Sequence, residues 1–124
     1  MKITTFNPMI LTRDPESVIA LFESLGFEKR HQKDGIEGQD ITNVRMKNAE
    51  GDHIDIVKVG FIEKDSTVIR MNVDDFDEAY EFLTARGFKN FQGEGHFINA
   101  ASAKGAIMVS PSGFAIDLAQ HIKD

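Results

Sequence analysis

The sequence predicts an α+β fold of two tandem βαβββ modules, which form curled mixed sheets around a concave cavity with one helix packed on the outside of each. The prediction rests first on an internal repeat: an offset of 61 residues aligns LFESLGFEK at 21–29 with FLTARGFKN at 82–90. An offset of 62 aligns GDHIDIVKV at 51–59 with GFAIDLAQH at 113–121. A one-residue insertion in a loop explains the difference. Each half also carries one helical pattern among strand-like runs.

The composition predicts a single globular domain over residues 1–124. Module one covers about 1–62 and module two about 66–124, with EKDS at 63–66 as the boundary. The chain is 41% hydrophobic and 27% charged, which is ordinary for a folded domain of this length. Its net charge of −6 argues against binding to nucleic acid or to an anionic membrane. The absence of cysteine excludes disulfides and cysteine-bound zinc. With no apolar run of about 20 residues and no leader-like start, we expect a cytoplasmic protein.

The first module begins with an extended run, TTFNPMILT, at 4–12. Asp14 is a good N-cap and Pro15 suits the first helical position, so a helix is expected to begin there. Gly26 ends it. Turn signals at KDG and NAEGD then separate three strand-like segments. The apolar residues that repeat at helical spacing are Val18, Ile19, Phe22 and Leu25.

The second module follows the same plan. A strand, STVIRMNV, is expected at 66–73. Asp75 and Glu78 have the spacing of a capping box, and Gly87 ends the helix. Turn signals at GEG and SPSG separate the later strands. The apolar stripe of this helix consists of Ala79, Phe82 and Leu83.

Strand alternation assigns the residues of the first and last strand of each module to two faces. The residues expected to face the helices are Ile10, Thr12, Ile54, Ile56, Met71, Val73, Ile116 and Leu118. The opposite face then carries Asp55 and Asp117 in the same frame. The predicted ligand pocket on this face consists of Asn7, Met9, His53, Asp55, Val68, Arg70, Asn72 and Asp117.

The tandem repeat, with MILTRDPESVIALFESLGFE at 9–28 and VSPSGFAIDL at 109–118, resembles the vicinal oxygen chelate superfamily, which includes glyoxalase, bleomycin-resistance and dioxygenase proteins. In its metal-dependent members, His or Gln on each first strand and Glu on each last strand hold a divalent cation. The cation binds two adjacent substrate oxygens and acts as a Lewis acid. The resemblance implies that these four positions are Asn7, Val68, Asp55 and Asp117 here. Neither first-strand position carries histidine, and Val68 cannot bind a metal.

Three interpretations of the paired aspartates follow. Their charge is neutralised by a local partner, for which Arg70 on the same face is the natural candidate. Alternatively, Asp55, Asp117 and the Asn7 side-chain oxygen form an oxygen-rich site for a hard cation. In the third interpretation, His53 replaces a missing histidine ligand, because it lies one strand repeat from Asp55. We expect no cofactor, with a divalent metal ion as the alternative.

Two classes of function fit these observations best. The first is a homodimeric small-molecule-binding protein that resembles the bleomycin-resistance type and has a degenerate metal site. The second is a glyoxalase-like lyase or isomerase in which Asp55 and Asp117 hold a divalent metal and one of them acts as a general base. The missing histidines favour the first class, whereas the two retained acids favour the second. A protein whose only role is assembly with a partner is a third class.

Overall fold

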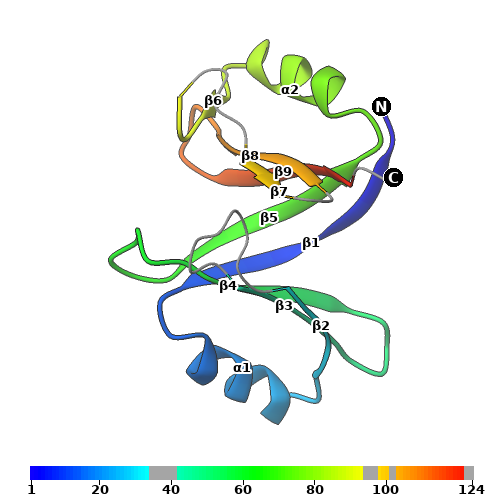
Figure 1. The fold of residues 1–124 in the computed structure, drawn as a ribbon, viewed down its shortest axis with the longest axis vertical. Helices are drawn as coiled ribbons and strands as arrows, with labels where there is room; N and C mark the ends of the chain where they lie inside the picture. The colour runs from blue at the N-terminus through cyan, green and yellow to red at the C-terminus, as the bar shows by residue number, and fades with distance from the viewer. Residues whose placement is uncertain (34–41, 94–97, 101–102, 122–124) are drawn as a thin grey trace. The chain divides into compact units, whose positions relative to one another are not determined.

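The computed structural model describes residues 1–33, 42–93, 98–100 and 103–121, and its elements follow the predicted order (Figure 1). The chain divides into two compact units: a first unit of Asn7–Thr67, and a second unit in which Met1–Phe6 joins Val68–Asp124. Strand β1 (Ile3–Thr12) therefore contributes residues to both units. None of the helices in the described ranges is long and apolar enough to span a membrane.

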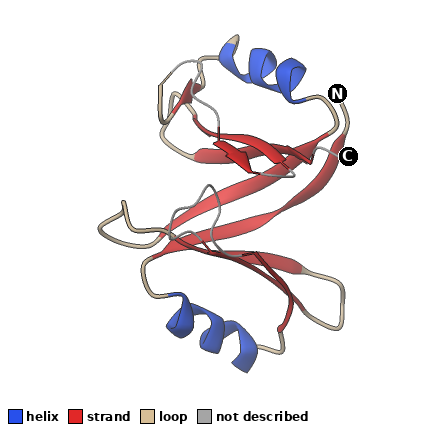
Figure 2. Ribbon diagram, viewed as in Figure 1, coloured by secondary structure: helices blue, strands red, loops and turns tan. Residues whose placement is uncertain are grey.

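The first unit contains α1 (Pro15–Ser24), β2 (Glu28–Lys33), β3 (Thr42–Lys47), β4 (His53–Lys58) and the second half of β1. Its strands lie in the order β2-β3-β4-β1, with β4 and β1 parallel and the other pairs antiparallel. Helix α1 packs on one face of this mixed sheet (Figure 2). The buried core between them consists of Ile19, Val44, Met46, Ile54 and Ile56.

The second unit contains all but the first two residues of β5 (Ser66–Val73), together with α2 (Phe76–Thr84), β6 (Lys89–Asn90), β7 (Ile98–Ala100), β8 (Ala103–Val109) and β9 (Ala115–His121). Strands β5 and β9 are parallel, and β8 is antiparallel to β9, β6 and β7. The expected first strand after the helix is therefore divided into two short pieces, β6 and β7. The core under α2 consists of Met71, Val73, Phe76, Ala79, Leu83, Ala106, Met108, Ile116 and Leu118.

The helix ends confirm the predicted caps. The Asp14 carboxylate accepts hydrogen bonds from the Ser17 backbone N–H (3.3 Å) and hydroxyl (2.6 Å). These bonds lower the pKa of Asp14 below its ordinary value of 3.8. Gly26 (φ 99°) and Gly87 (φ 91°) follow α1 and α2 in the left-handed conformation that ends many helices.

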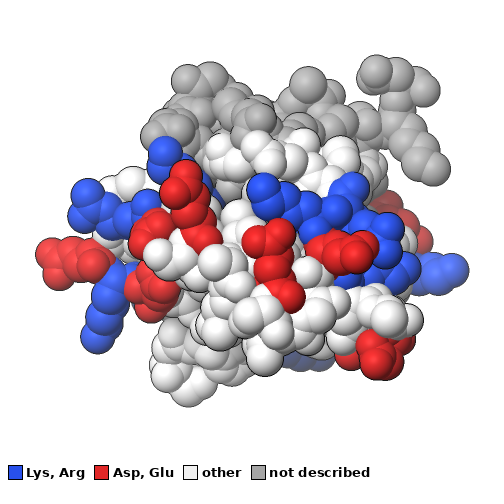
Figure 3. Space-filling model, turned by 90° about the horizontal axis from the view of Figure 1, so that it is seen from below, with Lys and Arg blue, Asp and Glu red and all other residues white. Residues whose placement is uncertain are grey.

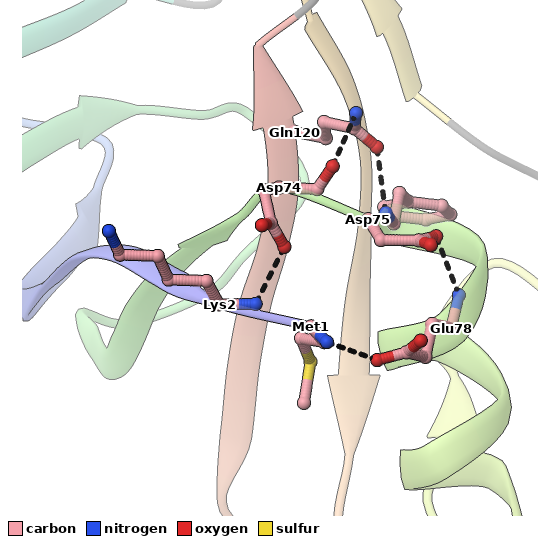
Figure 4. Close-up of polar contacts among 7 residues, drawn as sticks. Met1, Lys2, Asp74, Asp75, Glu78 and Gln120 are labelled. Carbon is pink, nitrogen blue, oxygen red and sulfur yellow. Dashed lines mark hydrogen bonds and ion pairs between the residues drawn. The ribbon is translucent and has the colours of Figure 1, made fainter.

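The start of α2 departs from the predicted capping box. Asp75 Oδ1 accepts from the Glu78 N–H (3.1 Å), but the Glu78 carboxylate accepts from the Met1 ammonium group instead of the cap backbone (Figure 4). Gln120 on β9 secures the same corner, since its Oε1 accepts from the Phe76 N–H (2.7 Å) and its Nε2 donates to the Asp74 carbonyl (3.0 Å). The first turn of α2 is therefore held by residues distant in sequence.

Two equivalent hairpin turns set the register of the last strands. The turns at 48–52 and 110–114 are 62 residues apart, and each has a positive-φ glycine at its fourth position, Gly51 (φ 92°) and Gly113 (φ 108°). Each is closed by a backbone bond between its first and last residues, at 3.1 Å and 2.8 Å. A three-residue loop with glycine in this conformation is a common hairpin connection. The two modules therefore have the same register between their last two strands.

Candidate functional site

The predicted division of the strands into two faces is confirmed within each unit. Ile54 and Ile56 pack in the core under α1, and Ile116 and Leu118 pack in the core under α2. Because neighbouring residues of a strand point to opposite faces, Asp55 and Asp117 each lie on the face of their own sheet that is turned away from the helix. These two faces carry the residues of the predicted site.

Asp55 is a fully buried carboxylate in the first unit, with 0% of its side chain exposed. Its Oδ2 accepts a hydrogen bond from Asn7 Nδ2 at 2.8 Å. The Arg45 guanidinium lies alongside, with Nε 3.2 Å from Oδ1 and Nη2 3.5 Å from Oδ2. Burial of a carboxylate is costly unless it is paired and hydrogen-bonded, and Asp55 is both.

The orientation of the Asn7 amide follows from its contacts. Its Nδ2 lies 2.8 Å from two acceptors, Asp55 Oδ2 and the Pro8 carbonyl, so this atom is the nitrogen. The other amide atom, Oδ1, is buried and has no hydrogen-bond partner in the described part of the chain. The predicted metal ligand Asn7 therefore acts as a hydrogen-bond donor to the predicted metal ligand Asp55.

Sequence reasoning missed Arg45, although the turn sequence contains the signal that identifies it. In an antiparallel hairpin, residues at equal distance from the turn lie opposite each other. Counting outward from the turn at 48–52 places Arg45 opposite Asp55, as the structure shows. The structure shows Arg45 as a partner of Asp55. The expected role of Arg70 as a local partner of the aspartates stays a prediction.

In the second unit, Arg70 lies beside Asp117 in the parallel register of β5 and β9, and Ile107 of β8 lies opposite Asp117 on the other side. In the first unit the corresponding neighbours of Asp55 are Met9 on β1 and Arg45 on β3. An arginine and an apolar residue therefore flank the aspartate in both modules. The arginine lies on the antiparallel neighbouring strand in the first module and on the parallel neighbouring strand in the second. In each module one arginine lies next to the aspartate on the same face.

The other predicted residues lie on the same faces. Met9 and Val68 are buried and apolar, with exposed fractions of 1% and 4%. Asn72 is also buried, and its Oδ1 has no hydrogen-bond partner among the described residues. His53 is half-buried at the start of β4, where it lies opposite Lys47 of β3. Of the predicted pocket residues, the structure shows Asn7 and Asp55 in direct contact through a hydrogen bond.

The donor atoms around Asp55 do not fit the divalent-cation site that the superfamily resemblance implies. Both carboxylate oxygens already face Arg45, and a divalent cation bound to them would lie within repulsive distance of its guanidinium group. Val68 offers no donor atom. Within the described residues, no group of three or more His, Cys, Asp or Glu side chains is arranged to hold a metal ion.

Comparison with known proteins identifies the fold. The sequence matches no protein-family model and no curated protein. Similar solved structures include the hypothetical protein BH1468 from Bacillus halodurans C-125, with a TM-score of 0.72 at 13% identity over 100% of this chain and 98% of that chain. Methylmalonyl-CoA epimerase from Mycobacterium tuberculosis is similar with a TM-score of 0.71 at 13% identity, over 98% and 90% of the two chains. The chain has the vicinal oxygen chelate fold.

A glyoxalase I mutant from Zea mays shares this vicinal oxygen chelate fold with a TM-score of 0.70 and 13% identity. The match covers 98% of this chain but 45% of the maize chain, so the present chain spans less than half of that protein. At such identities the likeness establishes the architecture, because one fold supports several chemistries. Any assignment of function must therefore come from the site.

Proposed function

We propose that the chain is a small-molecule-binding protein of the glyoxalase and bleomycin-resistance type, in which carboxylate–arginine pairs replace the metal site. The contact between Asp55 and Arg45 carries this proposal. In a metal-dependent member of the superfamily, the positive charge next to the last-strand carboxylate comes from a cation. Here a guanidinium group supplies it, which explains why the acid is retained while the other metal ligands are not.

The chemistry of the first-strand positions supports the same conclusion. Asn7 directs its N–H groups at Asp55 and at the Pro8 carbonyl, so it stabilises the carboxylate. Val68, its counterpart in the second module, is buried and apolar. Neither first-strand position therefore offers a histidine or glutamine ligand to a metal ion. The homodimer and the cytoplasmic location suggested by the sequence remain predictions.

The test combines a metal analysis with a ligand screen and an activity assay. Protein purified without chelators is expected to contain no stoichiometric metal and to show no hemithioacetal isomerisation with added Mg²⁺, Mn²⁺, Ni²⁺ or Zn²⁺. A thermal-shift screen of small organic compounds is expected to find a stabilising ligand, since a ligand at 100 times its Kd stabilises the folded state by about 2.7 kcal/mol. Stoichiometric metal together with turnover that Asp117→Ala abolishes would refute the proposal in favour of the lyase or isomerase.

A further inference from the structure

The geometry of the first unit points to Arg45 as the residue that binds the ligand, and to a small organic carboxylate as the class of ligand. This inference rests on the proposed binding function and names its ligand chemistry. Arg45 has 28% of its side chain exposed, whereas Asp55 behind it has none. The ion pair is therefore oriented, with its positive end toward the accessible side.

The guanidinium group retains donors for a ligand. It has five N–H groups, and Asp55 engages only the edge formed by Nε and Nη2. Among the described residues, the hydrogen bonds of Arg45 that the structure shows are the two to Asp55. The N–H groups of Nη1 and the second N–H of Nη2 make no hydrogen bond to the described residues, and 28% of the side chain is exposed. Their spacing suits the two oxygens of a carboxylate, which arginine binds through parallel hydrogen bonds.

The buried side of the pair fixes the position of Arg45. Asp55 is itself held by Asn7, whose amide orientation is set by a second bond to the Pro8 carbonyl. An arginine that is held in place before the ligand arrives loses little side-chain freedom on binding. The contacts that make Asp55 unsuitable for a metal ion thus prepare Arg45 for an anion.

The internal repeat gives independent support for a role of the arginine. Duplication of one module would place both arginines on equivalent strands, but Arg45 lies on β3 and Arg70 on β5. Residues equivalent to these two are Ile107 and Met9. Common ancestry of the modules therefore does not explain why an arginine lies beside the aspartate in each of them, whereas a shared requirement for a guanidinium group does.

The net charge of the chain supplies no general attraction for anions. Its net charge is −6, and acidic and basic side chains are interspersed on the face seen from the side of α1 (Figure 3). Long-range steering would therefore repel a carboxylate slightly. Binding of an anion must come from a local cation at short range, as Arg45 provides.

The experiment compares malonate with its uncharged analogue malonamide. Arg45 Nε–H is observed in nitrogen-15 spectra while each compound is added at constant ionic strength, with sodium chloride as the control for non-specific ionic effects. Malonate is expected to shift the Arg45 Nε–H signal saturably and to raise Tm, while malonamide and chloride leave the signal unchanged. An unchanged signal with malonate at millimolar concentration overturns the inference, and so does an equal response to malonamide.

Variants separate the charge of Arg45 from its structural role. Arg45→Met alone removes the guanidinium group beside the buried Asp55 carboxylate, so the test uses Arg45→Met combined with Asp55→Leu, which removes both charges. This double variant is expected to weaken malonate binding about tenfold or more. Arg45→Lys, which keeps the charge without the paired donors, is expected to weaken it less and provides a second test if the double variant does not fold. Arg30→Met removes an exposed arginine of the same unit and is expected to bind malonate normally.

The outcomes also distinguish this inference from the proposed function. If neutral compounds stabilise the protein and no carboxylate does, Arg45 is not the ligand-binding residue, but the protein is still a small-molecule binder. If the double variant binds malonate as tightly as the wild type, the inference is overturned in the same way. If the purified protein holds a metal and turns over substrate, the proposed function itself fails.

Discussion

The two glycines that end the helices allow a prediction in which one module is the control for the other. Gly26 and Gly87 occupy equivalent positions and have similar positive φ angles, 99° and 91°. A Cβ atom at Gly26 would meet nothing within 4 Å, whereas a Cβ atom at Gly87 would lie 2.8 Å from Pro111 Cγ. Substitution by alanine therefore imposes the same backbone strain at both positions and a steric clash at only one.

The magnitudes follow from these two terms. A non-glycine residue in the left-handed region costs about 1–2 kcal/mol, which applies to both variants. Overpacking against a rigid neighbour adds about 1–3 kcal/mol, which applies to Gly87→Ala alone because the proline ring cannot rotate away. Alanine also lowers the entropy of the unfolded chain, but equally at the two positions. We expect Gly87→Ala to lower the free energy of unfolding by about 2–5 kcal/mol and Gly26→Ala by about 1–2 kcal/mol.

Urea unfolding monitored by circular dichroism measures both losses. The decisive variant is Gly87→Ala combined with Pro111→Ala, since it removes the atom that clashes. Relative to Pro111→Ala alone, the added cost of Gly87→Ala is expected to fall to that of Gly26→Ala. If Gly26→Ala and Gly87→Ala lose the same free energy, or if Pro111→Ala brings no relief, the steric argument is wrong.

Three further predictions concern the polar contacts. Arg45→Met is expected to lower the free energy of unfolding by about 3–5 kcal/mol because it removes the guanidinium partner of a buried carboxylate, and adding Asp55→Leu is expected to recover much of that loss in the same urea assay. The pKa of Asp14 is lowered by its bonds to Ser17, so its contribution to stability is present above the unfolded-state value of 3.8 and is lost as the pH falls through the lower folded-state value. When the pH falls from above to below 3.8, the free energy of unfolding measured in urea should therefore decrease less for Asp14→Asn than for the wild type. An equal decrease in the two proteins would exclude this linkage. Gln120→Ala should cost about 1–3 kcal/mol and increase amide exchange in the first turn of α2, because the N–H and carbonyl groups that it serves lose their partners; unchanged exchange there would contradict this.

The parts of the fold that sequence predicted correctly depend on short-range chemistry. Asp14 caps α1 because a carboxylate at that position reaches N–H groups three residues on, and Gly26 ends the helix because its φ is positive. The faces of β4 and β9 follow from simple alternation around Ile54 and Ile116. The repeat of the whole module made each of these local predictions testable in a second copy.

The parts that sequence did not predict depend on contacts between distant segments. Arg45 is separated from Asp55 by ten residues and a turn, so the ion pair depends on which residues of two strands lie opposite each other. Glu78 had the spacing of a capping-box residue, but its carboxylate binds the Met1 ammonium group, 77 residues away in the chain. Residue spacing alone does not distinguish a local partner from a distant one, because both satisfy the same donor or acceptor.

The short turn at 48–52 determines more than the direction of the chain. Its length fixes which residue of β3 lies opposite each residue of β4, and a change of one residue in this pairing would place Val44 or Met46 beside Asp55 and move Arg45 to the side of α1. The glycine of this turn is exposed, and a Cβ atom added to it would meet nothing within 4 Å. An insertion or deletion at such a surface position would change the charge of the buried face without any substitution in it, which offers evolution or design a route to new binding chemistry through loop length alone.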